Sequence, residues 1–168
     1  MTKKLVGVVF IVLLVFAAAA FMMMRRSHMM GAMAQVKVGD LHAVTASGTP
    51  MPVPASAGEL PENTAIQESG GLLVSLALNP YPPTGSKSTD FDVTLADAAT
   101  GQPIADAAIS LDLTMPGMYM PPNKPVMEPG QAGKYHASGL FTMRGLWRIE
   151  VIITRAGQTQ SVFFDVGL

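Results

Sequence analysis

From Leu72 onward, apolar and polar positions alternate along the chain. In LLVSLALN, which begins at Leu72, every second side chain is a leucine or a valine, and DFDVTLAD, which begins at Asp90, alternates in the same way. A period of two places the apolar side chains on one face of a strand and the polar ones on the other. Each run therefore predicts a β-strand with one buried face.

Further runs with this period continue to the C-terminus, and no run has the helical period. The last two runs flank the turn residues Ala156 and Gly157, which predicts a hairpin. Short strands between Gly and Pro turns are typical of two packed antiparallel sheets. We predict an all-β domain over 71–168, an immunoglobulin-like antiparallel β-sandwich of about seven strands, with an open barrel as the competing architecture. The expected strands are 72–78, 89–96, 107–115, about 124–128, 133–141, 145–154 and 158–166.

Near the N-terminus, residues 5–24 form an uninterrupted apolar stretch with two basic residues on each side. About 20 such residues are enough for a helix to cross a bilayer. We therefore predict a transmembrane helix over 1–26 that makes this a single-pass protein of the cell membrane, with its C-terminal domain periplasmic or extracellular. The alternative is a secretory signal peptide cleaved at a small-residue site, at 17–19 or at 32–34.

Residues 27–70 connect the anchor to the alternating runs, and they begin with a methionine-rich segment. The part from 45 to 69 is rich in Ala, Ser, Thr, Pro and Glu, a composition that buries too little surface to offset the entropy of ordering. We therefore predict a methionine-rich juxtamembrane segment followed by a flexible linker. The alternation of apolar and polar residues over 35–44 is weak and indicates a further short strand there.

Composition excludes several classes of function. A net charge of -1 with 14% charged residues provides no basic surface for nucleic acid. The chain has no cysteine, so disulfides and thiolate chemistry are excluded. Its histidines are His28, His42 and His136, and no nucleophile, metal-protease or phosphate-binding motif accompanies them. We therefore do not expect an enzyme.

Methionine is the residue type that stands out, with 13 in the chain. Thioethers are soft, uncharged ligands that favour Cu(I), and imidazole also suits copper. Two groups each have a histidine nearby: Met22, Met23, Met24, Met29, Met30 and Met33, and then Met115, Met118, Met120, Met127 and Met143. The second group lies in the predicted domain, so it defines a candidate copper site.

The second group is expected to meet at one end of the sandwich. Met115 ends a predicted strand, and Met118 and Met120 are two residues apart, which places them on one side of an extended segment. Methionines that cap the open end of a core would have the same pattern, so packing remains the alternative. The candidate metal ligands are Met115, Met118, Met120, Met127, His136 and Met143. By itself, His136 lies in the polar phase of its strand and fits a surface histidine.

Three separate pieces of this sequence carry a resemblance to a known family. They are MPGMYM at 115–120, GKY at 133–135 and FTMRGLW at 141–147. In this order they resemble the YtkA-like domain and its relative FixH, over roughly residues 70–168. The resemblance implies an exported or membrane-tethered sandwich with a role in copper handling and in the assembly of haem-copper respiratory oxidases.

The resemblance also implies which residues bind the metal. Met115, Met118, Met120 and Met143 match the motif, whereas Met127 and His136 do not. Some relatives carry histidine where Met120 stands, and an all-thioether set would favour Cu(I) over Cu(II). A membrane-embedded transporter or oxidase subunit is the expected partner. The rival interpretation is a protein-interaction module without metal, in which the methionine-rich loop is an adaptable apolar surface.

Overall fold

The structure, a computed structural model, describes residues 37–168. The predicted anchor over 1–26 and the first part of the predicted linker, 27–36, lie outside the described residues. Within residues 37–168, no helix is long and apolar enough to cross a membrane. The N-terminal anchor therefore stays a prediction.

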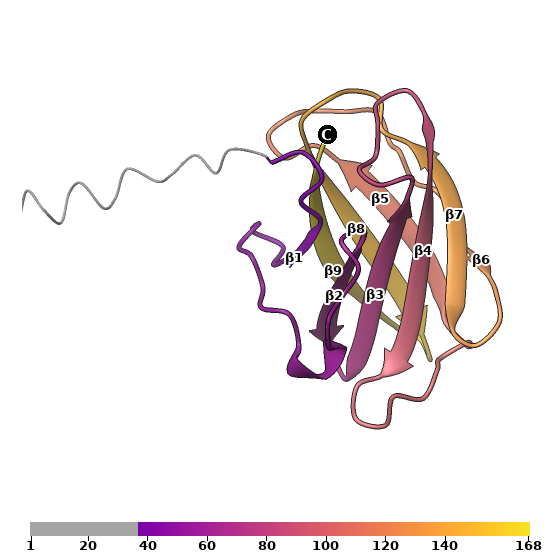
Figure 1. The fold of residues 1–168 in the computed structure, drawn as a ribbon. Helices are drawn as coiled ribbons and strands as arrows, with labels where there is room; N and C mark the ends of the chain where they lie inside the picture. Colours follow the sequence, from indigo (N-terminus) through magenta and orange to yellow (C-terminus); the bar gives the residue numbers. More distant parts are fainter. Residues whose placement is uncertain (1–36) are drawn as a thin grey trace, which may run out of the picture. The chain divides into compact units, whose positions relative to one another are not determined.

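The described chain folds into two antiparallel sheets, one packed on the other (Figure 1). One sheet has the strand order β1-β9-β8-β5 and the other has the order β2-β3-β4-β7-β6. The strands are β1 (His42–Val44), β2 (Thr64–Ser69), β3 (Leu72–Asn79), β4 (Ser88–Asp97), β5 (Ala108–Thr114), β6 (Glu128–Pro129), β7 (Lys134–Leu140), β8 (Leu146–Arg155) and β9 (Gln158–Gly167). The only helical turn in this part of the chain is the 3-10 turn η1 (Ala55–Ala57). The predicted all-β fold of two antiparallel sheets is confirmed.

The core lies between the sheets and is built from the inner faces that the alternation predicts. Along β3 and β8, buried and partly exposed side chains alternate residue by residue. Three of its largest fully buried side chains are aromatic and pack together: the ring centroids of Phe91 and Phe141 are 5.6 Å apart, and those of Phe141 and Trp147 are 5.2 Å apart in an edge-on arrangement. These rings fix the end of the sandwich where β8 begins.

The predicted linker is the main point at which the structure differs from the sequence analysis. β2 lies inside it and pairs with β3, from Thr64 opposite Ala77 to Ser69 opposite Leu72. The prediction that the folded domain begins at residue 71 is therefore wrong. The turn that joins the two strands is Gly70-Gly71, both with positive φ, and it allows a tight hairpin.

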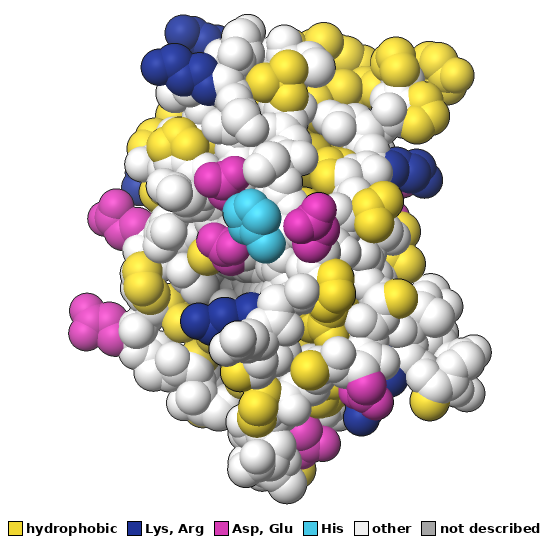
Figure 2. Space-filling view, turned by 90° about the vertical axis from the view of Figure 1, so that its right-hand side faces the viewer, with side chains coloured by type: hydrophobic (Ala, Val, Ile, Leu, Met, Phe, Trp, Pro, Cys, Tyr) yellow, Lys and Arg dark blue, Asp and Glu magenta, His cyan; other side chains and the backbone are white. Residues whose placement is uncertain are grey.

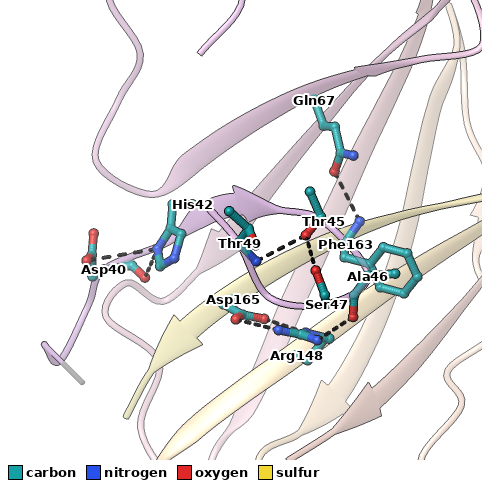
Figure 3. A network of polar contacts seen from close by, with 10 residues as sticks. All are labelled: Asp40, His42, Thr45, Ala46, Ser47, Thr49, Gln67, Arg148, Phe163 and Asp165. Atoms are coloured by element: carbon teal, nitrogen blue, oxygen red, sulfur yellow. Dashed lines mark hydrogen bonds and ion pairs between the residues drawn. The ribbon is translucent and has the colours of Figure 1, made fainter. Parts of the chain in front are cut away.

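The period-two pattern fails in β2 because both faces of this edge strand are covered. Ala65, Ile66 and Gln67 are buried in succession. The Gln67 side-chain oxygen accepts a hydrogen bond of 3.1 Å from the backbone N–H of Phe163 in the opposite sheet (Figure 3). One polar side chain of this segment, that of Gln67, thus forms a hydrogen bond between the two sheets and is not part of a flexible linker.

A partly buried ion pair holds the turn at 45–49 of the predicted linker against the four-stranded sheet. Arg148 donates from Nε and Nη2 to the two carboxylate oxygens of Asp165, at 2.8 and 2.9 Å, and from Nη1 to the carbonyl of Ala46 at 2.9 Å (Figure 3). The hydrogen bonds that Arg148 donates to Asp165 raise the pKa of Arg148. Because a bidentate pair fixes the guanidinium plane, the turn at 45–49 is held against β8 and β9.

The segment 123–127 covers the free edge of β5. The backbone N–H groups of Leu113 and Leu111 donate to the carbonyls of Asn123 and Pro125, at 2.9 and 3.0 Å, and Met127 donates to Ile109 at 3.3 Å. The chain then crosses to the other sheet as β6, which pairs with β7. The strand predicted over 124–128 is therefore mostly an irregular edge, since Pro125 has no N–H to donate.

One end of the sandwich gathers the loops that matter for function. Here β5 ends, β8 begins and β9 ends, because Thr114 pairs with Arg148 and Leu146 pairs with Gly167. The C-terminus lies at this end (Figure 1). We call it the methionine end and define it by residues 37–40, 79–87, 115–122, 140–145 and 167–168.

Candidate functional site

The methionine end contains a tight turn with a methionine at each corner. The backbone N–H of Met118 donates to the carbonyl of Met115 at 3.1 Å, and Gly117 has φ of 81°. Proline at the second position and glycine with positive φ at the third define a type II turn, which brings the first and fourth Cα atoms within about 7 Å. Met-Pro-Gly-Met is therefore a rigid turn that places Met115 and Met118 together.

Met118 and Met120 lie against a shared hollow beyond this turn. Met118 is 52% exposed, and Met120 is partly buried where it packs on the core. The hollow, of about 290 Å³, is lined by Asp112, Thr114, Met118, Tyr119, Met120, Pro121, Pro122 and Lys124. Two thioethers on one side of this loop agree with the two-residue spacing in the sequence.

The same hollow contains an ion pair that the sequence analysis missed. Lys124 Nζ lies 2.8 Å from Asp112 Oδ2, and this hydrogen bond raises the pKa of Lys124. Asp112 lies in the polar phase of β5, and Lys124 lies in the segment that covers the β5 edge. The segment was expected as a separate strand, so nothing in the residue pattern indicated that Asp112 and Lys124 would meet.

Met115 lies beneath the turn and belongs to the core. Its side chain is only 9% exposed, and its methyl carbon lies so close to Gly145 that a Cβ there would be 2.6 Å away. Gly145 also has φ of 136°. The glycine of the third sequence piece is therefore explained by the space that Met115 needs and by the backbone conformation.

Met143 lies in the neighbouring loop, with its side chain 42% exposed. Its carbonyl accepts a hydrogen bond of 3.0 Å from Trp147 Nε1, so the tryptophan holds the loop in place. The Met143 side chain borders a second hollow, of about 530 Å³, with Val38, Pro82, Pro83, Thr84, Gly85, Ser86, Thr142, Arg144 and Leu168. Met143 thus shares the methionine end with Met118 and Met120 but borders a different hollow.

Met127 is not at the methionine end. Its backbone N–H bonds to Ile109 at the start of β5, six residues before Met115. Six residues of strand correspond to roughly 20 Å. Its side chain is 5% exposed and forms part of the core. The structure therefore does not bring Met127 together with Met115.

His136 also lies elsewhere, in the middle of β7 on the outer face of the five-stranded sheet. The face drawn in Figure 2 has a histidine side chain with acidic side chains around it, as the contacts of His136 require. Its Nδ1 lies 2.9 Å from Asp92 Oδ1, and its Nε2 lies 3.9 Å from Asp90 Oδ1. The hydrogen bond to Asp92 raises the pKa of His136 above 6.5, and the charges of Asp90 and Glu128 act in the same direction.

The distance from His136 to the methionine end follows from the strand register. Leu140 is the last residue of β7, four residues beyond His136, which corresponds to roughly 13 Å. Among residues 37–168, no group of three or more His, Cys, Asp or Glu side chains has a geometry that could hold a metal ion. His136 therefore lies among carboxylates, apart from the thioethers.

The middle sequence piece, Gly-Lys-Tyr, has a structural explanation. The Tyr135 hydroxyl donates to the carbonyl of Ile104 and accepts from the N–H of Ala107, each at 3.2 Å. Gly133, with φ of 70°, has a carbonyl that accepts from the N–H of Leu95 at 2.8 Å. These two residues pin the connection between β4 and β5. Among the large apolar side chains of the three pieces, Met118, Tyr119 and Met143 are exposed, Tyr119 to 98%.

Together, the fold and this end define a class of protein, a small two-sheet sandwich that presents methionines on one rigid end. A family model described as YtkA-like matches residues 66–152, just over half of the chain, and the protein belongs to the YtkA-like family. The match begins inside β2, which agrees with the earlier start of the domain. No curated protein and no solved structure matches the chain.

Proposed function

We propose that this protein binds Cu(I) at the methionine end and serves as an exported accessory protein. The single observation that carries the proposal is the placement of Met118 and Met120 on one hollow, beyond a rigid turn, with the Met118 side chain half-exposed. An exposed thioether gains little from packing, whereas it is accessible to a soft cation.

Other residues of the methionine end fit the same proposal. Met115 lies at the other corner of the turn, and Met143 is exposed in the next loop. A methionine side chain has three rotatable bonds, so an exposed sulfur can turn toward an ion that its neighbours already hold. Met118 and Met120 would hold the ion first, and Met143 is a candidate third ligand. Thioethers are uncharged and soft, which favours Cu(I) over Cu(II) and over hard cations.

The destination of the copper follows from the family resemblance and the predicted anchor. A single-pass protein with its domain outside the cytoplasm would deliver Cu(I) to a membrane-embedded transporter or to a respiratory oxidase subunit. The domain itself performs no chemical step in this proposal. It binds, protects and releases the ion.

A second candidate function has support from a different observation. Tyr119 is 98% exposed at the tip of the same loop, and Leu140 is 41% exposed nearby. Exposed aromatic and methionine side chains are typical of surfaces that bind other proteins. In this alternative, the methionine end is an adaptable apolar contact for a partner, and no metal is involved.

The test is a Cu(I) titration of the full chain in detergent under reducing conditions, in competition with a Cu(I)-specific chelator. We expect the double variant Met118→Leu, Met120→Leu to lose at least about tenfold in affinity, or ~1.4 kcal/mol. Leucine keeps the apolar volume and removes the sulfur, so the fold should be retained.

Two matched controls come from the other candidate ligands. Met127→Leu and His136→Gln should leave the affinity within about twofold, because neither residue lies at the methionine end. If the double variant binds Cu(I) as tightly as the unaltered protein, the proposed site is wrong. If the unaltered protein binds no Cu(I), the interaction module becomes the better interpretation.

A further inference from the structure

We propose that the methionine end rests directly on an anionic membrane surface, with Tyr119 and its neighbouring apolar side chains in the headgroup region. This inference concerns the orientation of the domain and is independent of whether the end binds copper. Its occupant is the lipid surface itself, recognised by apolar contact and by positive charge.

The distribution of exposed apolar side chains is the first argument. Seven large hydrophobic residues are exposed in the described part of the chain. Five of these lie at the methionine end, namely Val38, Met118, Tyr119, Leu140 and Met143, whereas Val53 and Val126 lie elsewhere. Clustering at one end is uncommon for a surface that faces only water.

Tyr119 is the second argument. It is 98% exposed, so it gains almost nothing from contact with its own chain. Pro121 and Pro122 follow it, and the type II turn precedes it, so the loop that presents it is stiff. Tyrosine is enriched where membranes meet water, because its ring is apolar and its hydroxyl can reach the headgroups.

The charge at this end is the third argument. Lys37, Lys87 and Arg144 are exposed here, and none of them forms an ion pair within residues 37–168. Asp112 lines the hollow of Met118 and Met120, where it is paired with Lys124. Asp40 and Glu62 are acidic residues close by, on the side near Tyr81, whose pKa is raised by burial and, to a smaller extent, by their charges. Lys87 and Arg144 lie on the other side, in adjacent loops joined by the hydrogen bond from Ser86 N–H to the carbonyl of Phe141.

Figure 2 shows one side of this arrangement. Basic side chains lie at the upper left and hydrophobic ones at the upper right, and further basic side chains lie at the right edge, in the middle and near the bottom. The acidic side chains lie lower than the top, around the histidine and below it. Basic residues beside apolar ones suit an anionic lipid surface, which attracts the charges and accepts the apolar side chains. The acidic middle of the sheet would be repelled from the same surface.

The place where the chain enters the domain is the fourth argument. Val38 bridges Gly167, and the N–H of Gly39 donates to the carbonyl of Gly167 at 2.9 Å, so the described chain begins at the methionine end. If the predicted anchor ends at residue 26, only residues 27–36 separate it from Lys37. Ten residues span at most about 35 Å, which keeps this end near the bilayer and raises its effective concentration there.

The test uses the full chain in vesicles of phosphatidylcholine and phosphatidylglycerol, with bromine on the acyl chains as a quencher of tryptophan fluorescence. Tyr119→Trp places a reporter at the tip of the methionine end. Val126→Trp is the matched control, because Val126 is 76% exposed on the flank of the sandwich. The buried Trp147 is present in both variants and contributes the same background.

We expect the reporter at position 119 to lose about half of its fluorescence and the reporter at position 126 to lose little. Adding Lys87→Glu and Arg144→Glu to the Tyr119→Trp variant should reduce this quenching, and so should vesicles of phosphatidylcholine alone. Near-ultraviolet circular dichroism checks that each variant keeps its fold.

Equal quenching at the two positions, or none at either, would overturn the proposal. The absence of quenching at both positions would also favour a protein partner as the occupant of this end, because the vesicles contain lipid and no such partner. No copper is added and both reporters leave all methionines in place. Failure of this experiment is therefore distinguishable from failure of the copper proposal, which the titration decides.

Discussion

The methionine end and the outer face of the five-stranded sheet were expected to supply one site, yet they are chemically opposite. At the first, thioethers and a tyrosine project from a turn fixed by proline and glycine. At the second, His136 lies among Asp90, Asp92 and Glu128 in regular strand pairing. Soft neutral ligands and hard charged ones select different ions. Residues that lie close together in the sequence, such as His136 and Met143, therefore need not belong to the same site, because they can lie on different parts of the sandwich.

The comparison also divides the methionines themselves. Met115 and Met127 are core residues that happen to carry sulfur, whereas Met118 and Met143 are exposed and gain little from packing. The following measurements test the two distinctions, between the two regions and between buried and exposed methionines. They are ordered by the size of the expected effect.

The largest effect should come from truncating a buried methionine next to an exposed one. Met115→Ala should lower the free energy of unfolding by about 3 kcal/mol, because it leaves a cavity under the turn. Met118→Ala should change it by less than about 0.5 kcal/mol, since the side chain is 52% exposed. Urea denaturation of the full chain measures both. Similar losses for the two variants would contradict the division between core and surface methionines.

A smaller effect is expected at Gly145, which makes room for Met115. Gly145→Ala should cost about 2 kcal/mol, because a Cβ would meet the Met115 methyl and because φ is positive. Gly101→Ala is the control: φ is also positive there, but no atom lies within 4 Å, so about 1 kcal/mol should be lost.

The double variant Gly145→Ala, Met115→Ala isolates the contact between the two residues. Its loss should be about 1 kcal/mol less than the sum of the two single losses, because the clash disappears when the methyl is removed. Strict additivity would mean that the glycine is required only for its backbone conformation.

The smallest effect is the pH dependence that His136 contributes. Its pKa is raised in the folded state by the hydrogen bond to Asp92, so the pair stabilises the fold fully below pH 6.5. This contribution is lost as the pH rises through the raised pKa. Because the pair is exposed, the change should be only a few tenths of a kcal/mol.

Comparison of unfolding at pH 5.5 and pH 8.5 for the unaltered chain and for His136→Gln measures it. The histidine should account for the difference between the two pH dependences. A contribution of the opposite sign would show that the neutral form of His136 is the better partner in the fold.

The sequence predicted those strands in which one face is buried and the other is exposed to solvent. β3 and β8 alternate regularly, so their inner faces could be identified residue by residue. β2 could not, because Ala65, Ile66 and Gln67 are buried in succession. The pair Gly70-Gly71 is typical of a hairpin turn and could have indicated a strand before β3. The polar composition of residues 45–69 pointed instead to a flexible linker.

The candidate site was predictable only where local geometry decides it. The two-residue spacing of Met118 and Met120 and the Pro-Gly pair before them fix one turn and one hollow. The positions of Met127 and His136 depend on strand register and on which strands neighbour each other. Such long-range pairing leaves no mark in the spacing of residues along the chain.

The hydrogen bonds that Arg148 donates to Asp165 and to the carbonyl of Ala46 have a mechanical consequence. The chain enters beside the end of β9, where Val38 forms a parallel bridge with Gly167, and it turns before it pairs with β9 as the antiparallel strand β1. Tension on the entering chain would therefore meet the contacts with Gly167 first and the β1–β9 hydrogen bonds next, with the guanidinium contact to Ala46 behind them. A domain strapped in this way can be held under force from its N-terminal side without unravelling from that end.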